Sequence, residues 1–281
     1  MSPSTPTGGS FGALLRAWRT RRCMSQLDLA CAAGSSTRHL SFLETGRANP
    51  SREMALTLAE HLGMPLRERN RLLLAAGFAP HFPDRALAQG KISPDNRALT
   101  LVLCAQEPWP ALAVDRHWHL IEANRAVPPL LEGVAPDLLQ PPINVLRLSL
   151  HPDGLAPRIV NFAEWRSHVL RRLRLEVGAS ADPALERLHA ELAALPTPLR
   201  SRAKSPGVDL GGLATSFVLE TSLGLLNLFT TTTVFGTATD VTFDELTLES
   251  FVPADEASGE RLRALYGAYM ASDAPNLQAA G

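Results

Sequence analysis

The sequence lacks the features of a secreted, membrane-spanning or disulfide-stabilised protein. It has only three cysteines in 281 residues, and the spacing of Cys23, Cys31 and Cys104 fits neither a disulfide framework nor a CxxC pair. No run of about 20 apolar residues is present, so no membrane-spanning helix is expected. Residues 1–10 have neither a basic segment nor an apolar run, so they do not have the pattern of a signal peptide. We therefore expect a cytoplasmic protein with no membrane partner.

The motifs of common enzymes and metal sites are also missing. The sequence contains no GxSxG elbow, no phosphate-binding glycine loop and no HExxH pair. His117 and His119 flank Trp118 in an expected strand, where their side chains would share a face, but we identify no carboxylate or cysteine at ligand spacing. The acidic stretch 240–249 alternates with apolar residues and is interpreted as a half-buried strand region. These observations predict no catalytic residues, no metal site and no cofactor.

Charge is distributed unevenly along the chain. Residues 1–80 carry ten Arg against five Asp or Glu, a net charge of +5, whereas residues 81–281 carry seventeen basic and twenty-three acidic residues, a net charge of −6. Apolar residues make up 45% of the sequence, enough for a buried core. A length of 281 residues suits two domains. The chain is therefore predicted to join a basic module to a mildly acidic one.

The pattern of residue types changes near residues 80–95, which contain three prolines and one glycine. We predict a disordered tail at 1–10, a helical domain at 11–80, a connecting segment at 81–104, an α+β domain at 105–270 and a disordered tail at 271–281. Within the α+β domain, the patterns predict helices at 161–178 and 183–195 and a loop at 196–212. Strands are expected at 111–114, 118–121, 213–219, 225–234 and 241–251.

The helical domain contains the most specific motif of the chain, between residues 19 and 47. Five short helices are predicted from the spacing of apolar residues, and Ser25, Ser36 and Ser51 are expected to cap three of them. Gly34 lies in the turn between the second and third helices, where a positive φ is expected. Leu40 would anchor the third helix in the core. This pattern is typical of a helix-turn-helix.

The third helix would then direct a set of side chains away from the core. Its N-terminal residues Thr37 and Arg38 lie in the part of such a helix that reaches base edges in the major groove. Arg38 is predicted to bond guanine, and Phe42 to touch a thymine methyl group. The complete predicted DNA-binding set is Gln26, Ser36, Thr37, Arg38, His39, Ser41, Phe42 and Arg47. The alternative is an ordinary helical bundle with a solvated face, because two short helices joined by a turn also occur in proteins that bind no DNA.

Within this set, Gln26 begins the second helix, where its side chain and the backbone amides could meet a phosphate. His39 and Arg47 are also better placed for phosphates than for bases. The prediction thus separates residues that would position the protein on DNA from residues that would read sequence.

Residues 11–78 resemble the Cro/C1-type, or Xre-like, helix-turn-helix family. The matching residues are Arg19, Ser25, Gln26, Leu29, Ala30, Gly34, Ser36, Leu40, Leu43, Glu44, Gly46, Arg47, Pro50 and Ser51. The resemblance implies an all-α five-helix bundle with double-stranded operator DNA as its partner. In that family the arginine of the first helix pairs with the glutamate that ends the recognition helix. Arg19 and Glu44 are therefore expected to form a buried structural ion pair.

Residues from about 105 to 265 resemble, more loosely, the second domain of MmyB-like regulators. Matching positions include Pro110, Asp115, Trp118, Asn124, the stretch 144–148, His151 and Trp165. The resemblance implies a PAS-like fold that binds a small apolar effector non-covalently, such as a fatty acid. The residues expected to bind it are Trp109, Trp118, Asn124, Phe162, Trp165, Val169, Phe229 and Phe251. Any one of these aromatic residues, taken alone, is better explained as part of a core.

Two hypotheses for the whole chain follow. In the first, a homodimeric, sequence-specific transcriptional regulator binds an apolar effector in its second domain. The dimer is expected because two such modules at half-sites one helical turn apart give the usual specificity. In the second, the second domain binds no ligand and serves for dimerisation or protein interaction. An enzyme tethered to DNA would instead require a cluster of titratable groups in one cleft.

Overall fold

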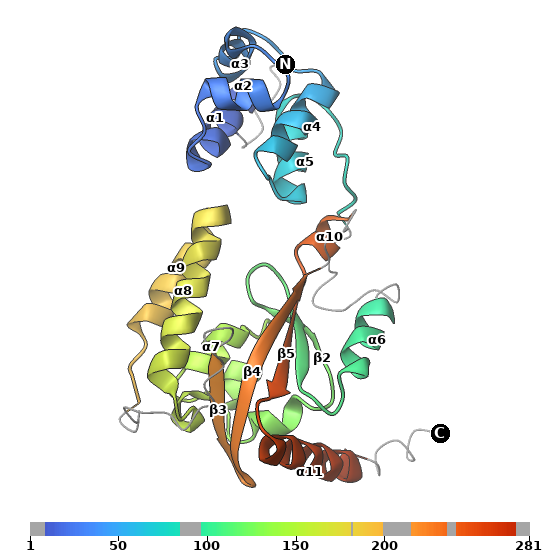
Figure 1. Cartoon of the computed structure of the whole chain (residues 1–281), viewed down its shortest axis with the longest axis vertical. Coiled ribbons are helices and arrows are strands. Elements are labelled where there is room, and N and C mark those ends of the chain that lie inside the picture. The colour runs from blue at the N-terminus through green and yellow to red at the C-terminus, as the bar shows by residue number, and fades with distance from the viewer. Residues whose placement is uncertain (1–8, 85–96, 181, 199–214, 235–239, 274–281) are drawn as a thin grey trace. The chain divides into compact units, whose positions relative to one another are not determined.

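The computed structural model of the chain describes residues 9–84, 97–180, 182–198, 215–234 and 240–273. The chain forms two compact units (Figure 1). The first comprises Met1–Ala86 together with Phe235–Asp244, and the second comprises Leu87–Val234 and Glu245–Gly281. The two-domain arrangement is confirmed, but a short segment from the second half of the sequence belongs to the first unit. Most of the predicted tails, 1–10 and 271–281, lies outside the described residues.

The N-terminal part of the first unit consists of the five predicted helices. These are α1 (Phe11–Arg21), α2 (Gln26–Ala32), α3 (Thr37–Glu44), α4 (Arg52–His61) and α5 (Leu66–Ala75). The hydroxyls of Ser25, Ser36 and Ser51 accept hydrogen bonds from backbone N–H groups at the starts of α2, α3 and α4, as predicted. Gly34 has a φ of +61°, which confirms the left-handed turn between α2 and α3.

The core of this unit brings α1 against α3. Leu15, Leu29 and Leu40 are fully buried, so the apolar faces of α1, α2 and α3 meet in one cluster. Gly12 makes the close approach of α1 to α3 possible, because a Cβ there would overlap the backbone carbonyl of Glu44. The position of α3 in the bundle is therefore set by dense packing on its inner face.

A short helix, α10 (Val241–Asp244), completes the first unit. The sequence predicted a strand over 241–251, and that prediction was wrong for its first six residues, since α10 covers 241–244 and the strand begins only at Thr247. Alternation over so few positions does not distinguish a strand from one helical turn. The Val241 N–H donates to the Pro83 carbonyl at 2.9 Å, and the Leu66 N–H donates to Asp244 Oδ2 at 3.1 Å. Since Pro65 provides no side-chain cap, Asp244 supplies an acceptor at the start of α5.

The second unit is built on a five-stranded antiparallel sheet with the order β2-β1-β5-β4-β3. The strands are β1 (Ala111–Val114), β2 (Leu120–Ala123), β3 (Ser216–Thr221), β4 (Gly224–Val234) and β5 (Thr247–Pro253). The strand predicted at 118–121 begins two residues later, because residues 115–119 form a tight turn. The sheet and the helices that pack on it confirm the α+β class.

The helices of the second unit match the prediction in part. They are α6 (Arg97–Ala105), α7 (Val145–Leu150), α8 (Phe162–Ser180), α9 (Pro183–Ala194) and α11 (Glu256–Asp273), with 3₁₀ turns η3 (Pro128–Leu131), η4 (Pro136–Leu139) and η5 (Ala156–Arg158). α8 and α9 pack on each other and confirm the two predicted helices, while α11 lies against β4 and β5 (Figure 1). The sequence did not predict α6, which falls within the expected connecting segment, or α11.

The loop predicted at 196–212 lies mostly outside the described residues. Among the residues that the structure does describe, no helix combines the length and the apolar character needed to cross a bilayer.

Candidate functional site

The N-terminal half of α3 presents an exposed polar surface. The side chains of Thr37 and Arg38 are exposed, and the Arg38 guanidinium lies over the Phe42 ring, 5.4 Å from its centroid. Ser36 accepts a hydrogen bond from the His39 N–H at 3.1 Å, and its own hydroxyl proton stays available to a phosphate. Arg38 and Phe42 thus form one continuous surface at the end of the helix that would face a groove.

Other residues of the predicted DNA-binding set are less exposed. His39, Ser41 and Phe42 are half-buried, whereas Arg47 is exposed just after α3. The Gln26 amide donates to Glu44 Oε2 at 2.8 Å, and its phosphate contact stays a prediction. At the start of α2, the backbone N–H groups are therefore better candidates for a phosphate contact than the Gln26 side chain.

The predicted ion pair between Arg19 and Glu44 is present. Arg19 Nε lies 2.6 Å from Glu44 Oε1, the second guanidinium nitrogen lies 3.0 Å from Oε2, and the Glu44 side chain is only 3% exposed. Burial by itself raises the pKa of the Glu44 carboxyl, but the hydrogen bonds from Arg19 and Gln26 outweigh it and leave that pKa below its usual value. This bidentate pair fastens α1 to the end of α3 and has a structural role.

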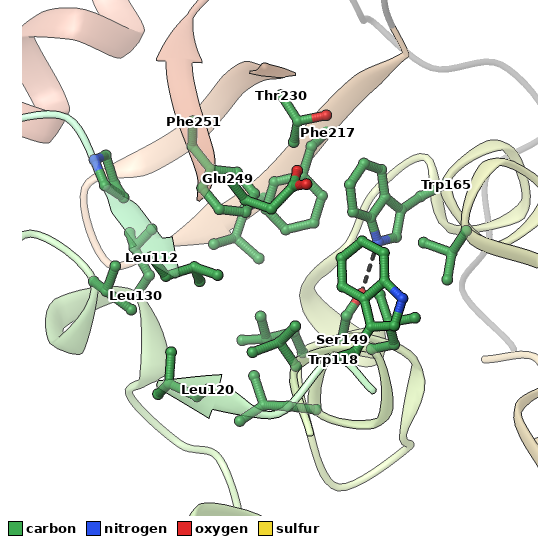
Figure 2. A pocket seen from close by; sticks show the side chains of 18 of the residues that line it. Leu112, Trp118, Leu120, Leu130, Ser149, Trp165, Phe217, Thr230, Glu249 and Phe251 are labelled. Atoms are coloured by element: carbon green, nitrogen blue, oxygen red, sulfur yellow. Dashed lines mark hydrogen bonds between the residues drawn. The ribbon is translucent and has the colours of Figure 1, made fainter. Parts of the chain in front are cut away.

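A cavity of about 110 Å³ lies inside the second unit (Figure 2). It is bounded by the sheet, by the segment from β2 to α7 and by α8, and its walls are mostly aliphatic and aromatic side chains. Four of the predicted ligand-binding residues line it: Trp118, Trp165, Val169 and Phe251.

The other four predicted residues are not part of the lining. Asn124 is buried and uses its amide on the backbone, since it donates to the carbonyls of Leu103 and Trp109 and accepts from the Ala111 N–H. Phe162 is fully buried in the apolar core. These two residues support the walls of the unit and do not contact the cavity.

The side chains of Trp109 and Phe229 do not line the cavity, because each is directed elsewhere. The Trp109 ring is covered by the Arg263 guanidinium at 5.1 Å. Phe229 neighbours the lining residue Thr230 on β4, and because successive side chains of a strand point to opposite faces, it lies on the other side of the sheet.

A small set of polar groups meets the apolar lining. Arg172 donates from a terminal guanidinium nitrogen to Glu249 Oε1 at 2.7 Å, and Thr232 donates to the same oxygen at 3.0 Å. Arg172 Nε also lies 3.4 Å from Glu176 Oε1, and its guanidinium stacks 4.5 Å from the centroid of the Trp118 ring. The sequence analysis did not identify this network, because Arg172 on α8 and Glu249 on β5 are 77 positions apart.

The protonation of two nearby groups is shifted by their surroundings. Burial raises the pKa of the Glu176 carboxyl, although hydrogen bonds from Trp118 and Arg172 act against that rise. Burial also lowers the pKa of His168, and the charges of Arg172 and Arg171 lower it further. His168 is therefore a neutral member of the lining near neutral pH.

A tight turn over residues 115–119 positions Trp118. Trp118 has a φ of +65°, and Asp115 Oδ1 accepts hydrogen bonds from the N–H groups of His117 and His119, each at 2.8 Å. The indole Nε1 then donates to Glu176 at 2.8 Å. The turn thus holds the Trp118 ring in the wall of the cavity.

The same turn corrects the reasoning about metal ligands. Asp115, His117 and His119 bring one ligand atom each to within 4.8 Å of one another, so a carboxylate does lie beside the two histidines. In the structure, His119 Nδ1 is 3.1 Å from Asp115 Oδ2 and His117 Nε2 is 2.9 Å from Asp182 Oδ2. The first contact lies within the turn, and the second connects the turn to the start of α9.

Comparison with known proteins agrees with this division of the chain. Residues 10–72 match a helix-turn-helix domain, and residues 96–265 match the MmyB-like transcription regulator ligand binding domain. Uncharacterized HTH-type transcriptional regulators of Mycobacterium bovis and of two strains of Mycobacterium tuberculosis are each 34% identical to this chain over 126 residues.

Those 126 residues are 45% of this chain and 42% of each relative, so the chain spans less than half the length of the curated relatives that it matches. The match to the ligand-binding domain covers more than half of the chain and spans the sheet, the cavity and the helices around it. The chain therefore belongs to the family of MmyB-like transcription regulators, with a helix-turn-helix domain preceding the ligand-binding domain.

Proposed function

We propose that this protein is a homodimeric, sequence-specific DNA-binding transcriptional regulator controlled by a small apolar effector. The effector would bind non-covalently in the cavity of the second unit, which we take to be PAS-like on the strength of its antiparallel sheet and its family resemblance. A fatty acid is the example of this class that the family resemblance implies. The observation that carries the proposal is the presence, in one chain, of an exposed recognition helix and an apolar cavity in separate units.

The first unit supports the DNA-binding half of the proposal through charge and geometry. Its N-terminal 80 residues carry the net charge of +5, which favours a polyanion. Thr37 and Arg38 are exposed at the capped start of α3, where side chains of such helices reach base edges. A guanidinium at this position has the geometry to bond guanine in two places.

The cavity supports the effector half of the proposal. One water molecule needs about 10–15 Å³, and apolar cavities of larger volume stay dry and accept apolar ligands. The side chains around this space of about 110 Å³ forgo packing against one another, a loss of roughly 2–3 kcal/mol at about 24 cal/mol per Å³ that a bound apolar ligand would offset. A module that served only for dimerisation would gain nothing from that loss. The cavity therefore favours ligand binding over the alternative of a ligand-free interaction module.

The chain also provides a covalent route between the two functions. β4 and β5 contribute Thr230, Glu249 and Phe251 to the cavity, and the segment that joins these strands contains α10. α10 belongs to the helical unit, where Asp244 caps α5. An effector that binds one arrangement of β4 and β5 better than another would thereby bias the helical unit.

Selection of bound genomic fragments with the full chain tests DNA binding, and enrichment of a defined two-fold symmetric site is the expected result. Titration of an apolar ligand by calorimetry, in the presence and absence of DNA carrying that site, tests whether the ligand regulates DNA binding. Coupling between sites is reciprocal, so DNA must change ligand affinity by the same factor by which ligand changes DNA affinity. Equal ligand affinities in both titrations would leave the second unit without a regulatory role.

A further inference from the structure

The cavity carries a charge pattern that narrows the ligand class. We propose that it selects uncharged apolar molecules with a polar oxygen at one end, such as alcohols or esters of long alkyl chains, and that Glu249 excludes carboxylates. The proposal rests on effector binding in this cavity, and it assigns Glu249 as the residue that determines specificity. Free fatty acids would then be poor ligands, although their alkyl chains suit the walls.

The carboxylate of Glu249 is the first observation. Glu249 is only 5% exposed, lies on the central strand β5 and lines the cavity together with Phe217 and Phe251. Figure 2 shows its carboxylate among the apolar side chains of the cavity. A ligand that enters therefore meets a fixed negative group in a region with little water.

The cation that faces this carboxylate is already engaged. Arg172 bonds Glu249 at 2.7 Å, lies 3.4 Å from Glu176 and stacks on the ring of Trp118 at 4.5 Å. Two carboxyl groups thus share one guanidinium. His168, the other basic side chain among the described lining residues, has a lowered pKa and is neutral near neutral pH. Arg172 has no surplus positive charge for a ligand carboxylate.

A ligand carboxylate in this part of the cavity would lie near the Glu249 carboxylate and would have no unpaired cation among the described lining residues to neutralise it. The ligand carboxylate and the Glu249 carboxylate repel each other in this partly buried site, and Arg172, which is already paired, offsets only part of that repulsion. We expect at least about a tenfold loss of affinity relative to a neutral ligand. A neutral oxygen avoids that loss. The guanidinium has five N–H donors, so it can donate to a ligand hydroxyl or carbonyl oxygen without releasing Glu249.

The remaining polar lining also suits an uncharged group. The Ser149 hydroxyl accepts from Trp165 Nε1 at 2.7 Å, and Thr230 places a second hydroxyl beside Phe251 on the sheet (Figure 2). Hydroxyls can donate and accept, and they add no charge. The cavity therefore offers hydrogen bonds to a ligand oxygen without offering a counter-ion.

Three probes of one chain length test this inference in the delipidated full chain: 1-dodecanol, methyl dodecanoate and dodecanoate. Their dissociation constants are measured by tryptophan fluorescence at pH 8, below the concentration at which any of them aggregates. We expect the alcohol and the ester to bind at least about tenfold more tightly than the acid. Equal or tighter binding of dodecanoate would overturn the proposal while leaving effector binding intact. Failure of all three to bind would overturn both.

Glu249→Gln assigns the effect to one residue. Removing the negative charge of Glu249 leaves Arg172 with Glu176 as its carboxylate neighbour, so the ratio of dodecanoate affinity to dodecanol affinity should rise about tenfold or more. Glu191→Gln is the matched control, because it removes the same charge from an exposed pair with Arg147 that does not line the cavity. An unchanged ratio of acid to alcohol affinity in a folded Glu249→Gln protein, checked by its circular dichroism, would overturn the role of Glu249.

Discussion

The two units of this protein use charged side chains in opposite ways. In the helical unit, the buried pair of Arg19 and Glu44 joins helices and leaves the recognition face open. In the ligand-binding unit, the pair of Arg172 and Glu249 stands in the wall of a cavity, where it meets whatever enters. The shortest nitrogen–oxygen distances of the two pairs are similar, 2.6 and 2.7 Å. Their surroundings, dense packing in one case and an apolar cavity in the other, decide what each pair does.

The comparison also shows how differently the two units depend on distant parts of the chain. The helix-turn-helix takes its turn, its core and most of its caps from residues 10–76, close in sequence. The cavity takes its walls from residues between 110 and 251, on strands, turns and helices. The helix α10 crosses this division, because it brings Asp244 to the start of α5.

The largest expected effect is on the ion pair of the helical unit. Glu44→Gln leaves Arg19 charged and unpaired, at a cost of about 3–5 kcal/mol. Hydrogen exchange of the full chain should show lost protection in α1 and α3 and unchanged protection in the sheet. Glu68→Gln is the matched control, because its pair with Arg71 is exposed and should matter by less than about 1 kcal/mol. Equal losses of stability from the two substitutions would mean that burial of the Arg19–Glu44 pair adds nothing to its contribution.

Acid should act on the same pair. The pKa of Glu44 is lowered in the folded protein, so the carboxylate contributes stability above its unfolded pKa, and that contribution is lost as pH falls through the folded value. Protection of α1 and α3 against hydrogen exchange, corrected for intrinsic rates, should therefore fall as the solution is acidified below the usual pKa of glutamate. In the Glu44→Gln protein this part of the pH dependence should disappear. Its persistence there would assign the acid effect to other groups.

The next effect concerns sequence reading by α3. Arg38→Ala should cost about 1–3 kcal/mol at the specific site and relax preference at one base position. Fluorescence anisotropy on the selected duplex and on a random duplex measures the loss of affinity for each, and duplexes with the base changed at that position measure the preference. Arg71→Ala removes the same charge from α5 and should affect the two duplexes equally. If Arg38→Ala also weakened both equally, Arg38 would be a phosphate contact.

The smallest expected effect concerns α10, which lies in the segment between β4 and β5 and belongs to the helical unit. Asp244→Ala removes the acceptor for the Leu66 N–H and should destabilise α5 by about 0.5–2 kcal/mol. It should also reduce the factor by which effector changes DNA affinity, while leaving effector affinity in the absence of DNA unchanged. Asp137→Ala, in the 3₁₀ turn η4, is a control outside both the cavity lining and the helical unit. An unchanged coupling factor in Asp244→Ala would exclude this segment as the route.

The helical unit was predictable because its signals are local. Ser25, Ser36 and Ser51 cap helices that start one residue later, and Gly34 occupies a turn that needs a positive φ. The spacing of Leu29 and Leu40 follows the helical period. The pair of Arg19 and Glu44 was expected from resemblance to a family in which these two helix positions pair. Each of these features is specified within a few residues or by a compact motif.

The cavity was predictable only in its broad character. Four of eight proposed lining residues reach it, since an aromatic side chain in a sequence does not reveal which face of its strand or helix meets a void. Phe229 and Thr230 are adjacent on β4 and point to opposite sides, and that difference depends on the register of the sheet.

The polar contacts between residues far apart in the sequence were decided by the tertiary structure alone. Arg172 meets Glu249 across 77 positions, and Leu66 meets Asp244 across 178. Such contacts depend on strand order, helix docking and the path of a connection, none of which local propensity specifies. The amino-acid sequence therefore establishes a helix-turn-helix and an apolar α+β unit, because caps, turns and apolar periods act over short distances. The placement of a carboxylate and a guanidinium in the cavity wall follows from the folded topology.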